Sequence, residues 1–204
     1  MRVRHLLVAW FTVLAFRSLG HHSGLTTHPD VIIDDSFTPS ELRGVYGGMD
    51  SWSEHAPNVS FTPTLVTHAE AIRLALRNDT DNTIWVVRVT SAMDGDCPGS
   101  VDRSGLPFTN AIAGAWTRAS NGSVVICMDA VYLNEHQGIW TADGWRSVMA
   151  HELGHAFGLQ HNTTSSETVM YPKYGELQAD DVTCDDVADF VRRWGYALPA
   201  ECLR

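Results

Sequence analysis

The sequence HELGHAFGLQH places three histidines, a glutamate and two glycines at fixed intervals within an apolar run. His151 and His155 are four residues apart, so on a helix their imidazoles lie on one face, about one turn apart, and can reach the same ion. Glu152 lies next to the first histidine and can project beside this ion without binding it. Gly158 can end the helix in a backbone conformation that residues with a Cβ resist, after which the chain can return His161 as a third ligand.

This donor set predicts a catalytic zinc site. Three neutral imidazoles on a tetrahedral ion leave the fourth position open for water, whereas structural zinc is bound by four protein ligands. Zinc lowers the pKa of such a water and polarises a carbonyl group, and its charge stabilises a tetrahedral oxyanion. Glu152 would accept the proton of the attacking water and pass it to the leaving amine. The spacing therefore predicts metal-assisted hydrolysis of a peptide bond.

The alternative is an ordinary amphipathic helix whose histidines are exposed or hydrogen-bonded in the core. With typical residue frequencies, H-E-x-x-H arises by chance in roughly one protein in a few hundred, and the addition of G-x-x-H lowers this to the order of one in a hundred thousand. Either histidine alone would favour the structural interpretation. The complete set, on a helix that is expected to end at Gly158, favours the metal site.

The chain of 204 residues has a formal net charge of −10 at pH 7, which argues against nucleic acid or an anionic membrane as the partner. Two arginines precede an apolar run at 6–16 that is too short to span a bilayer, which is the layout of a secretory signal peptide over 1–20. A disordered N-terminus is the alternative, because no A-x-A cleavage site follows the run. We expect a flexible segment at 21–30 and one catalytic domain at 31–204.

The four cysteines form no C-x-x-C pair and suggest two disulfides in an exported chain. Of the three pairings, we favour Cys97 with Cys127 and Cys184 with Cys202, because each closes a modest loop. Four free thiols are the alternative, and a cytosolic location would require them. The expectation is therefore a secreted protein with two disulfides.

Apolar periodicity and turn signals predict an alternation of strands and helices. The expected strands span 31–35, 58–61, 83–90, 110–116 and 123–133. The expected helices span 38–52, 67–78, 141–157 and 183–194. Thr183 and Asp186 resemble a capping box for the last helix, and Gly195 lies just beyond its end. Strands mixed with helices indicate an α/β or α+β domain.

Two groups of aspartates are explained without a bound cation. Asp94, Asp96 and Asp102 could hold calcium, but a solvated loop is favoured because Ca²⁺ requires six or more oxygen ligands. The second group is best explained as a solvated face near a helix N-terminus. It consists of Asp180, Asp181, Asp185, Asp186 and Asp189.

HELGHAFGLQH together with the downstream VMYP resembles the matrixins, a family of metzincin zinc endopeptidases. The resemblance covers most of the chain after the leader. It implies an α+β fold with a twisted, mixed five-stranded sheet, one antiparallel edge strand, an active-site helix, and a C-terminal helix after a tight Met-turn. It also implies one catalytic zinc, with roles for five residues: His151, His155 and His161 as ligands, Glu152 as general base and acid, and Met170 as the Met-turn residue below the metal.

The resemblance further implies where a substrate would bind. An extended peptide would pair with the edge strand by β-augmentation, at Ala113, Gly114 and Ala115. The wall of the pocket for the residue after the cleaved bond would follow the Met-turn, at Tyr171, Pro172 and Tyr174. A second, structural zinc is not expected, because residues 91–127 contain no histidine.

The expected partner is a protein or peptide substrate, and the expected state is a monomer without stable membrane insertion. Two other functions stay open. One is a cell-wall or virion-associated metallopeptidase that cuts peptide cross-links. The other is a zinc-binding protein without turnover, against which the intact Glu152 argues, because such a protein has no chemical need for a carboxylate there.

Overall fold

The computed structural model describes residues 25–77, 81–89, 115–120, 122–172 and 179–203. Their strands form one sheet in the order β2-β1-β3-β5-β4. The strands are β1 (Asp30–Asp34), β2 (Thr62–Val66), β3 (Thr83–Val89), β4 (Ala115–Ser120) and β5 (Ser123–Asp129). The pairs of β1 with β2, β1 with β3 and β3 with β5 are parallel, whereas β4 pairs antiparallel with β5 at the edge of the sheet.

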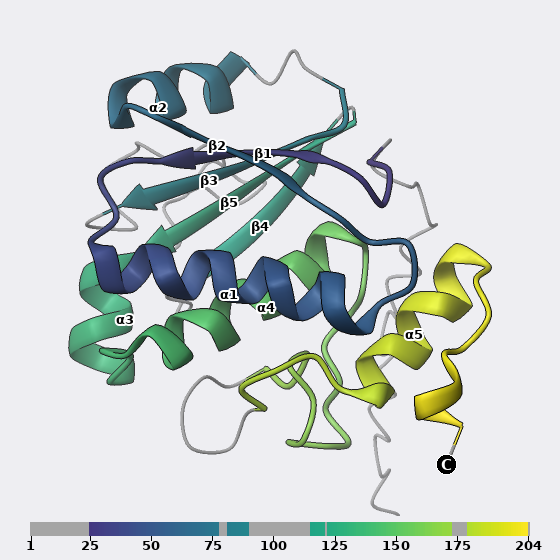
Figure 1. The fold of residues 1–204 in the computed structure, drawn as a ribbon. Coiled ribbons are helices and arrows are strands. Elements are labelled where there is room, and N and C mark those ends of the chain that lie inside the picture. The colour runs from purple at the N-terminus through teal and green to yellow at the C-terminus, as the bar shows by residue number, and fades with distance from the viewer. Residues whose placement is uncertain (1–24, 78–80, 90–114, 121, 173–178, 204) are drawn as a thin grey trace, which may run out of the picture.

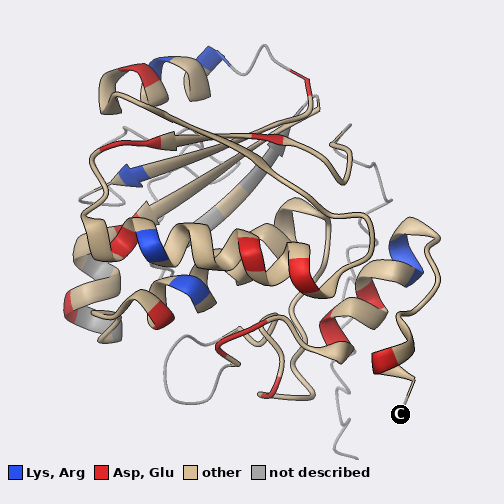
Figure 2. Cartoon of the chain, in the orientation of Figure 1, with Lys and Arg blue, Asp and Glu red and all other residues tan. Residues whose placement is uncertain are grey.

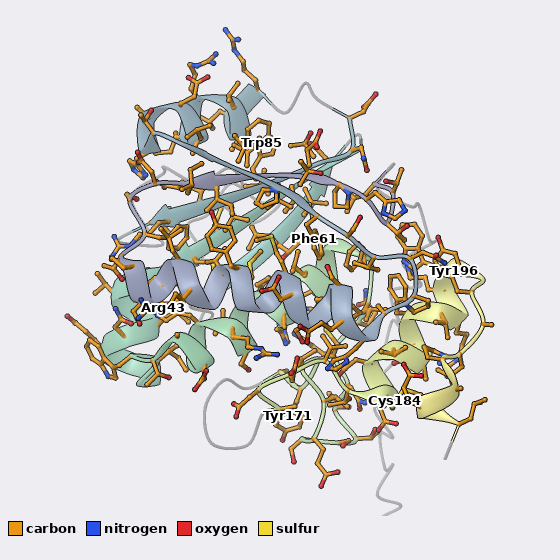
Figure 3. All side chains as sticks on the ribbon, in the orientation of Figure 1. Arg43, Phe61, Trp85, Tyr171, Cys184 and Tyr196 are labelled. Carbon is orange, nitrogen blue, oxygen red and sulfur yellow. A yellow bond between two sulfur atoms is a disulfide. The ribbon has the colours of Figure 1, made fainter. Side chains whose placement is uncertain are left out.

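Helices cover both faces of this sheet (Figure 1). Helix α2 (His68–Arg77) lies on one face, and α1 (Pro39–His55) and α4 (Ala142–Ala156) lie on the other. Side chains of a strand alternate between the faces. Ile84 accordingly joins the larger cluster beneath α1 and α4, whereas Trp85 joins the smaller cluster and points toward α2 (Figure 3). This layered arrangement is the mixed architecture of helices and strands that the element pattern predicts. No described helix is long and apolar enough to cross a membrane.

The close contact between α1 and α4 explains why the glycines of α1 do not interrupt it. A Cβ added to Gly48 would lie 2.7 Å from the Cβ of Met149 and 2.8 Å from the backbone nitrogen of Ala150. Near the end of α1, the Trp52 indole donates a hydrogen bond to the carbonyl of Ala150 at 2.8 Å. The missing side chains therefore let the two helix backbones approach each other. Through this contact α1 helps to position α4, the helix that carries His151 and His155.

The helix boundaries follow from capping. Thr38 and Glu41 form a capping box at the start of α1, and Thr141 accepts a hydrogen bond from the Gly144 N–H at the start of α4. Helix α5 (Cys184–Trp194) begins with the expected capping box at Thr183 and ends at Gly195 in the left-handed conformation.

The C-terminal segment after α5 is cross-linked to this helix and contacts the N-terminal part of the described chain. A disulfide joins Cys184 at the start of α5 to Cys202 in the 3-10 helix η1 (Ala200–Cys202), which is the pairing favoured above. Phe190 stacks with Tyr196, and the Tyr196 hydroxyl lies 3.4 Å from the Thr27 Oγ1. Cys127 is also disulfide-bonded, and its expected partner, Cys97, lies outside the described residues.

Two predicted strands are placed differently by the structure. The segment 58–61 is not a strand: it begins in a turn, in which Asn58 has a φ of 60° and the Val59 N–H donates to the Ala56 carbonyl, and continues without regular structure to Phe61. The strand begins only at Thr62 and contains Pro63, which is tolerated because β2 is an edge strand. Residues 130–133 belong to helix α3 (Ala130–Gln137) rather than to the preceding strand. Most of the predicted strand at 110–116 lies outside the described residues.

Acidic residues are spread over α1, α5 and the loop between α4 and α5, and basic residues lie on α1, α4 and α5 (Figure 2). Within this loop, Asp181 accepts hydrogen bonds from Ser51 of α1 and from the Arg146 guanidinium of α4. Asp181 is still 40% exposed at its side chain, and in addition to this contact with solvent it links the loop to α1 and α4.

The tight α1–α4 contact predicts that alanine substitutions of two adjacent glycines of α1 affect stability differently. Gly48→Ala should lower the free energy of unfolding by about 1–3 kcal/mol, because its Cβ overlaps α4. Gly47→Ala is the matched control, since its Cβ would meet only the Arg146 side chain at 3.3 Å. The control should be neutral or stabilising by up to about 1 kcal/mol, because alanine favours the helix. Urea denaturation of both variants measures the difference, and equal effects would contradict the packing argument.

Candidate metal centre

Three histidine rings converge at the C-terminal end of α4. His151 and His155 lie one turn apart on this helix, which ends at Ala156, and Gly158 follows two residues later with a φ of 86°. The chain then reverses and places the Nε2 of His161 3.2 Å from the Nε2 of His151 and 3.1 Å from that of His155. The structure thus brings together the three histidines that the sequence singles out, with one ligand atom from each within 4.8 Å of the others.

Backbone carbonyls set the tautomers of the two helical histidines. The Nδ1 of His151 lies 2.6 Å from the Val169 carbonyl oxygen, and the Nδ1 of His155 lies 2.9 Å from that of Leu159. A carbonyl oxygen can only accept a hydrogen bond, so each Nδ1 carries the proton. The lone pair of each ring is therefore on Nε2 and faces the other histidines. Such outer hydrogen bonds are the usual means of orienting a metal-binding imidazole.

The spacing of these nitrogens fits a zinc ion. Zn–N bonds of 2.0–2.1 Å in a tetrahedral arrangement place the ligand nitrogens about 3.3 Å apart. The separations of 3.1 and 3.2 Å from His161 to its neighbours are close to this value. Two Nε2 lone pairs held against a third imidazole are unfavourable without a proton or a cation between them. The donor set and its spacing are therefore those of a metal site.

The surroundings keep His151 and His161 in the neutral state that binds metals. Burial, with the neighbouring His155 and His161, lowers the pKa of His151 to about 3. Partial burial and His155 also lower the pKa of His161, and Glu152 opposes this shift. Because both pKa values lie below the usual one for histidine, neither ring has to release a proton near neutral pH when it binds a metal.

Met170 packs against α4, the helix that carries His151 and His155. Its sulfur packs so closely on Gly154 that a Cβ there would collide with Sδ. The glycine inside HELGH is therefore required by the approach of Met170, and Trp52 closes the same contact from α1. Met170 is 2% exposed, as expected for a packing residue.

Asp186 holds the segment that contains Met170. This aspartate of α5 is 2% exposed and accepts hydrogen bonds from the backbone N–H groups of Val169 and Met170, at 3.1 and 3.3 Å. It also accepts from the N–H and hydroxyl of Thr183, at 3.0 and 2.7 Å. Because the Val169 carbonyl receives the proton of the His151 ring, Asp186 is linked to the metal centre through one residue.

The solvated face expected for the aspartates is wrong for Asp186, which is 2% exposed. Burial raises the pKa of Asp186, while its hydrogen bonds with Thr183, Val169 and Met170 oppose this shift. The capping box at Thr183 was visible in the sequence, but the bonds to the Met170 segment connect residues about 16 positions apart and left no such pattern.

Glu152 belongs to α4, its side chain contacts the edge strand β4, and it is 1% exposed. The hydroxyl of Thr117 in β4 donates a hydrogen bond to its Oε2 at 2.5 Å. Nothing in the sequence singles out Thr117, because a threonine on a strand is ordinary and its partner lies 35 residues away.

The remaining predicted site residues are placed only in part. Tyr171 is half-buried on the loop between α4 and α5 (Figure 3), and Pro172 is exposed next to it. Ala115 is the first residue of β4. The predicted residues outside the described ranges are Ala113, Gly114 and Tyr174, together with the candidate calcium ligands Asp94, Asp96 and Asp102.

The buried position of Asp186 predicts a large effect of its substitution. Asp186→Asn should lower the free energy of unfolding by about 2–3 kcal/mol, because the amide group turns a donor toward backbone N–H groups that need an acceptor. The neighbouring Asp185 is exposed at the start of the same helix. Asp185→Asn is therefore the control and should cost less than about 1 kcal/mol. Urea denaturation measures both, and a neutral Asp186→Asn variant would contradict this role.

Comparison with known protein families identifies the family of this chain. A sequence profile of the family described as Matrixin matches residues 43–192, which include all of α4 and every residue of the candidate metal centre. Among solved structures, archaemetzincin from Methanopyrus kandleri is similar at 16% sequence identity and a TM-score of 0.49, over 83% of this chain and 97% of the archaemetzincin chain. No curated protein sequence matches the chain. Because the profile covers well over half of it, the chain belongs to the matrixin family of zinc metallopeptidases.

Proposed function

We propose that the protein is a secreted zinc-dependent endopeptidase, with His151, His155 and His161 as zinc ligands and Glu152 as the general base. One observation carries this proposal. The Nε2 of His161 lies at the spacing of tetrahedral zinc ligands from the Nε2 atoms of both His151 and His155, and the glutamate that follows His151 in the chain is 1% exposed. Three protein ligands leave one position for water or substrate, which is the arrangement of a catalytic rather than a structural site.

The residues of the centre would divide the reaction between them. The three imidazoles would hold the ion, and the carbonyls of Val169 and Leu159 keep the Nε2 lone pairs of His151 and His155 available to it. A zinc ion bound there supplies Lewis acidity, which lowers the pKa of water and polarises the scissile carbonyl. Glu152 then accepts a proton from the attacking water and transfers it to the leaving amine. Its position beside the first ligand allows both transfers without direct binding to the metal.

An extended substrate would bind along β4. This strand is paired with β5 on one side and lies at the edge of the sheet, so its outer side can accept a further strand. Ala113, Gly114 and Ala115 would contribute this pairing, and Tyr171, Pro172 and Tyr174 would line the pocket beyond the cleaved bond. Met170 would act by packing alone, beneath the ligands.

Secretion is proposed from the leader and the disulfide. The predicted signal peptide at 1–20 would direct export, and the Cys184–Cys202 bond is consistent with an oxidising compartment. The protein would act there as a monomer on protein or peptide substrates.

The roles of Glu152 and His161 are separable by experiment. Glu152→Gln keeps the side-chain shape but cannot accept the proton, so we expect kcat on casein to fall by about 10²–10⁴-fold with zinc still bound at one ion per chain. His161→Ala should lose zinc during dialysis and with it the activity. Zinc content by atomic emission and casein cleavage with and without a chelator measure both effects.

His28→Ala is the matched control for His161→Ala. His28 is also an exposed histidine, but its ring is hydrogen-bonded to Ser60 and not to any of the three clustered histidines. Its zinc content and activity should equal those of the wild type. A wild-type protein that binds zinc but cleaves neither casein nor peptidoglycan would contradict the proposed enzyme. Cleavage of peptidoglycan cross-links alone would assign the substrate to the cell wall.

A further inference from the structure

The edge strand contacts the glutamate of the metal centre directly. The Thr117 Oγ1 lies 2.5 Å from the Glu152 Oε2 and 3.1 Å from the backbone carbonyl oxygen of the same residue. A hydroxyl has one proton, and the shorter distance identifies the carboxylate as its acceptor. Hydrogen bonds from a hydroxyl to an ionised carboxylate have lengths of about 2.5–2.7 Å and are roughly twice as strong as neutral ones.

This contact restricts a side chain that otherwise has much freedom. Glutamate has three side-chain torsions, and the loss of its rotamers costs up to about 2 kcal/mol. Catalytic groups must nevertheless be held within about 0.5 Å of their working position. The hydroxyl of Thr117 fixes the Oε2 end of the carboxylate from β4, while the backbone of Glu152 is fixed by α4.

We propose that Thr117 is a positioning residue for the general base. Its hydroxyl holds the carboxylate of Glu152 in the orientation that accepts the proton of the attacking water. The proposal rests on the proposed role of Glu152. It assigns Thr117 no contact with the reacting atoms, so the residue acts on the rate through Glu152 alone.

A purely structural role makes a different prediction. The same hydroxyl lies near the Glu152 carbonyl and could simply attach β4 to α4, two elements that are in contact. Loss of that attachment would lower stability and disturb the metal centre as a whole. Loss of a positioning bond would instead lower kcat while zinc content and substrate binding stay the same.

The test compares two substitutions of Thr117 in the zinc-loaded protein. Thr117→Val keeps the shape and removes the hydroxyl, and we expect kcat for a casein-derived peptide to fall by about 10–100-fold. KM should change less than about threefold, and zinc should remain at one ion per chain. Thr117→Ser keeps the hydroxyl and should retain kcat within about threefold of the wild type.

A matched control comes from the opposite edge of the sheet. Thr64 is exposed on β2, so Thr64→Val makes the same chemical change away from Glu152 and should leave kcat unaltered. In a Glu152→Gln background, Thr117→Val should cause no further loss of kcat, because two changes that act through one group are not additive.

Three results would overturn the proposal. The first is a Thr117→Val variant with wild-type kcat, and the second is a Thr117→Ser variant as impaired as Thr117→Val. The third is a loss of activity in Thr117→Val that only follows its loss of zinc or of folded protein in thermal unfolding. An inactive wild type would overturn the proposed function as well, whereas an active wild type with any of these three results overturns the role of Thr117 alone.

Discussion

Three imidazole rings that converge, with one ligand nitrogen of each within 4.8 Å of the others, are the arrangement on which the rest of this structure depends. The Nε2 of His161 lies 3.2 Å from that of His151 and 3.1 Å from that of His155. Lone pairs at this distance repel unless a proton or a cation lies between them, so the fold has to hold the rings in place before a metal arrives. Two backbone carbonyls do this for the helical histidines, and the burial of His151 keeps its ring neutral.

The support for these rings comes from elements that are distant in sequence. Helix α5 supplies Asp186, whose carboxylate fixes the backbone of Val169 and Met170. Val169 in turn accepts the proton of His151, and Met170 fills the space that Gly154 leaves on α4. The Cys184–Cys202 disulfide joins the start of α5, the helix that carries Asp186, to the 3-10 helix η1. Stability and metal binding therefore depend on the same few contacts.

Local signals in the sequence predict the elements that carry these groups, but not the contacts between them. The spacing of HELGHAFGLQH and the threonine caps predict α4 and α5 closely, because both depend on residues within one or two turns. The turn at Asn58 and helix α3 were missed, since their short apolar stretches fit a strand equally well. The burial of Asp186 was also missed. Its sequence neighbours are acidic, and only the fold brings the backbone of Val169 to it.

The position of Glu152 shows why the helix alone does not make the site. Its backbone belongs to α4, but its carboxylate is bonded from β4, the strand along which an extended substrate would lie. A substrate paired with β4 would therefore be placed in register with the same strand that orients the base. The strand that aligns the scissile bond would then also orient the carboxylate, whose backbone is held by α4. This geometry gives the hydroxyl of Thr117 a function that a hydrophobic residue of the same shape could not replace.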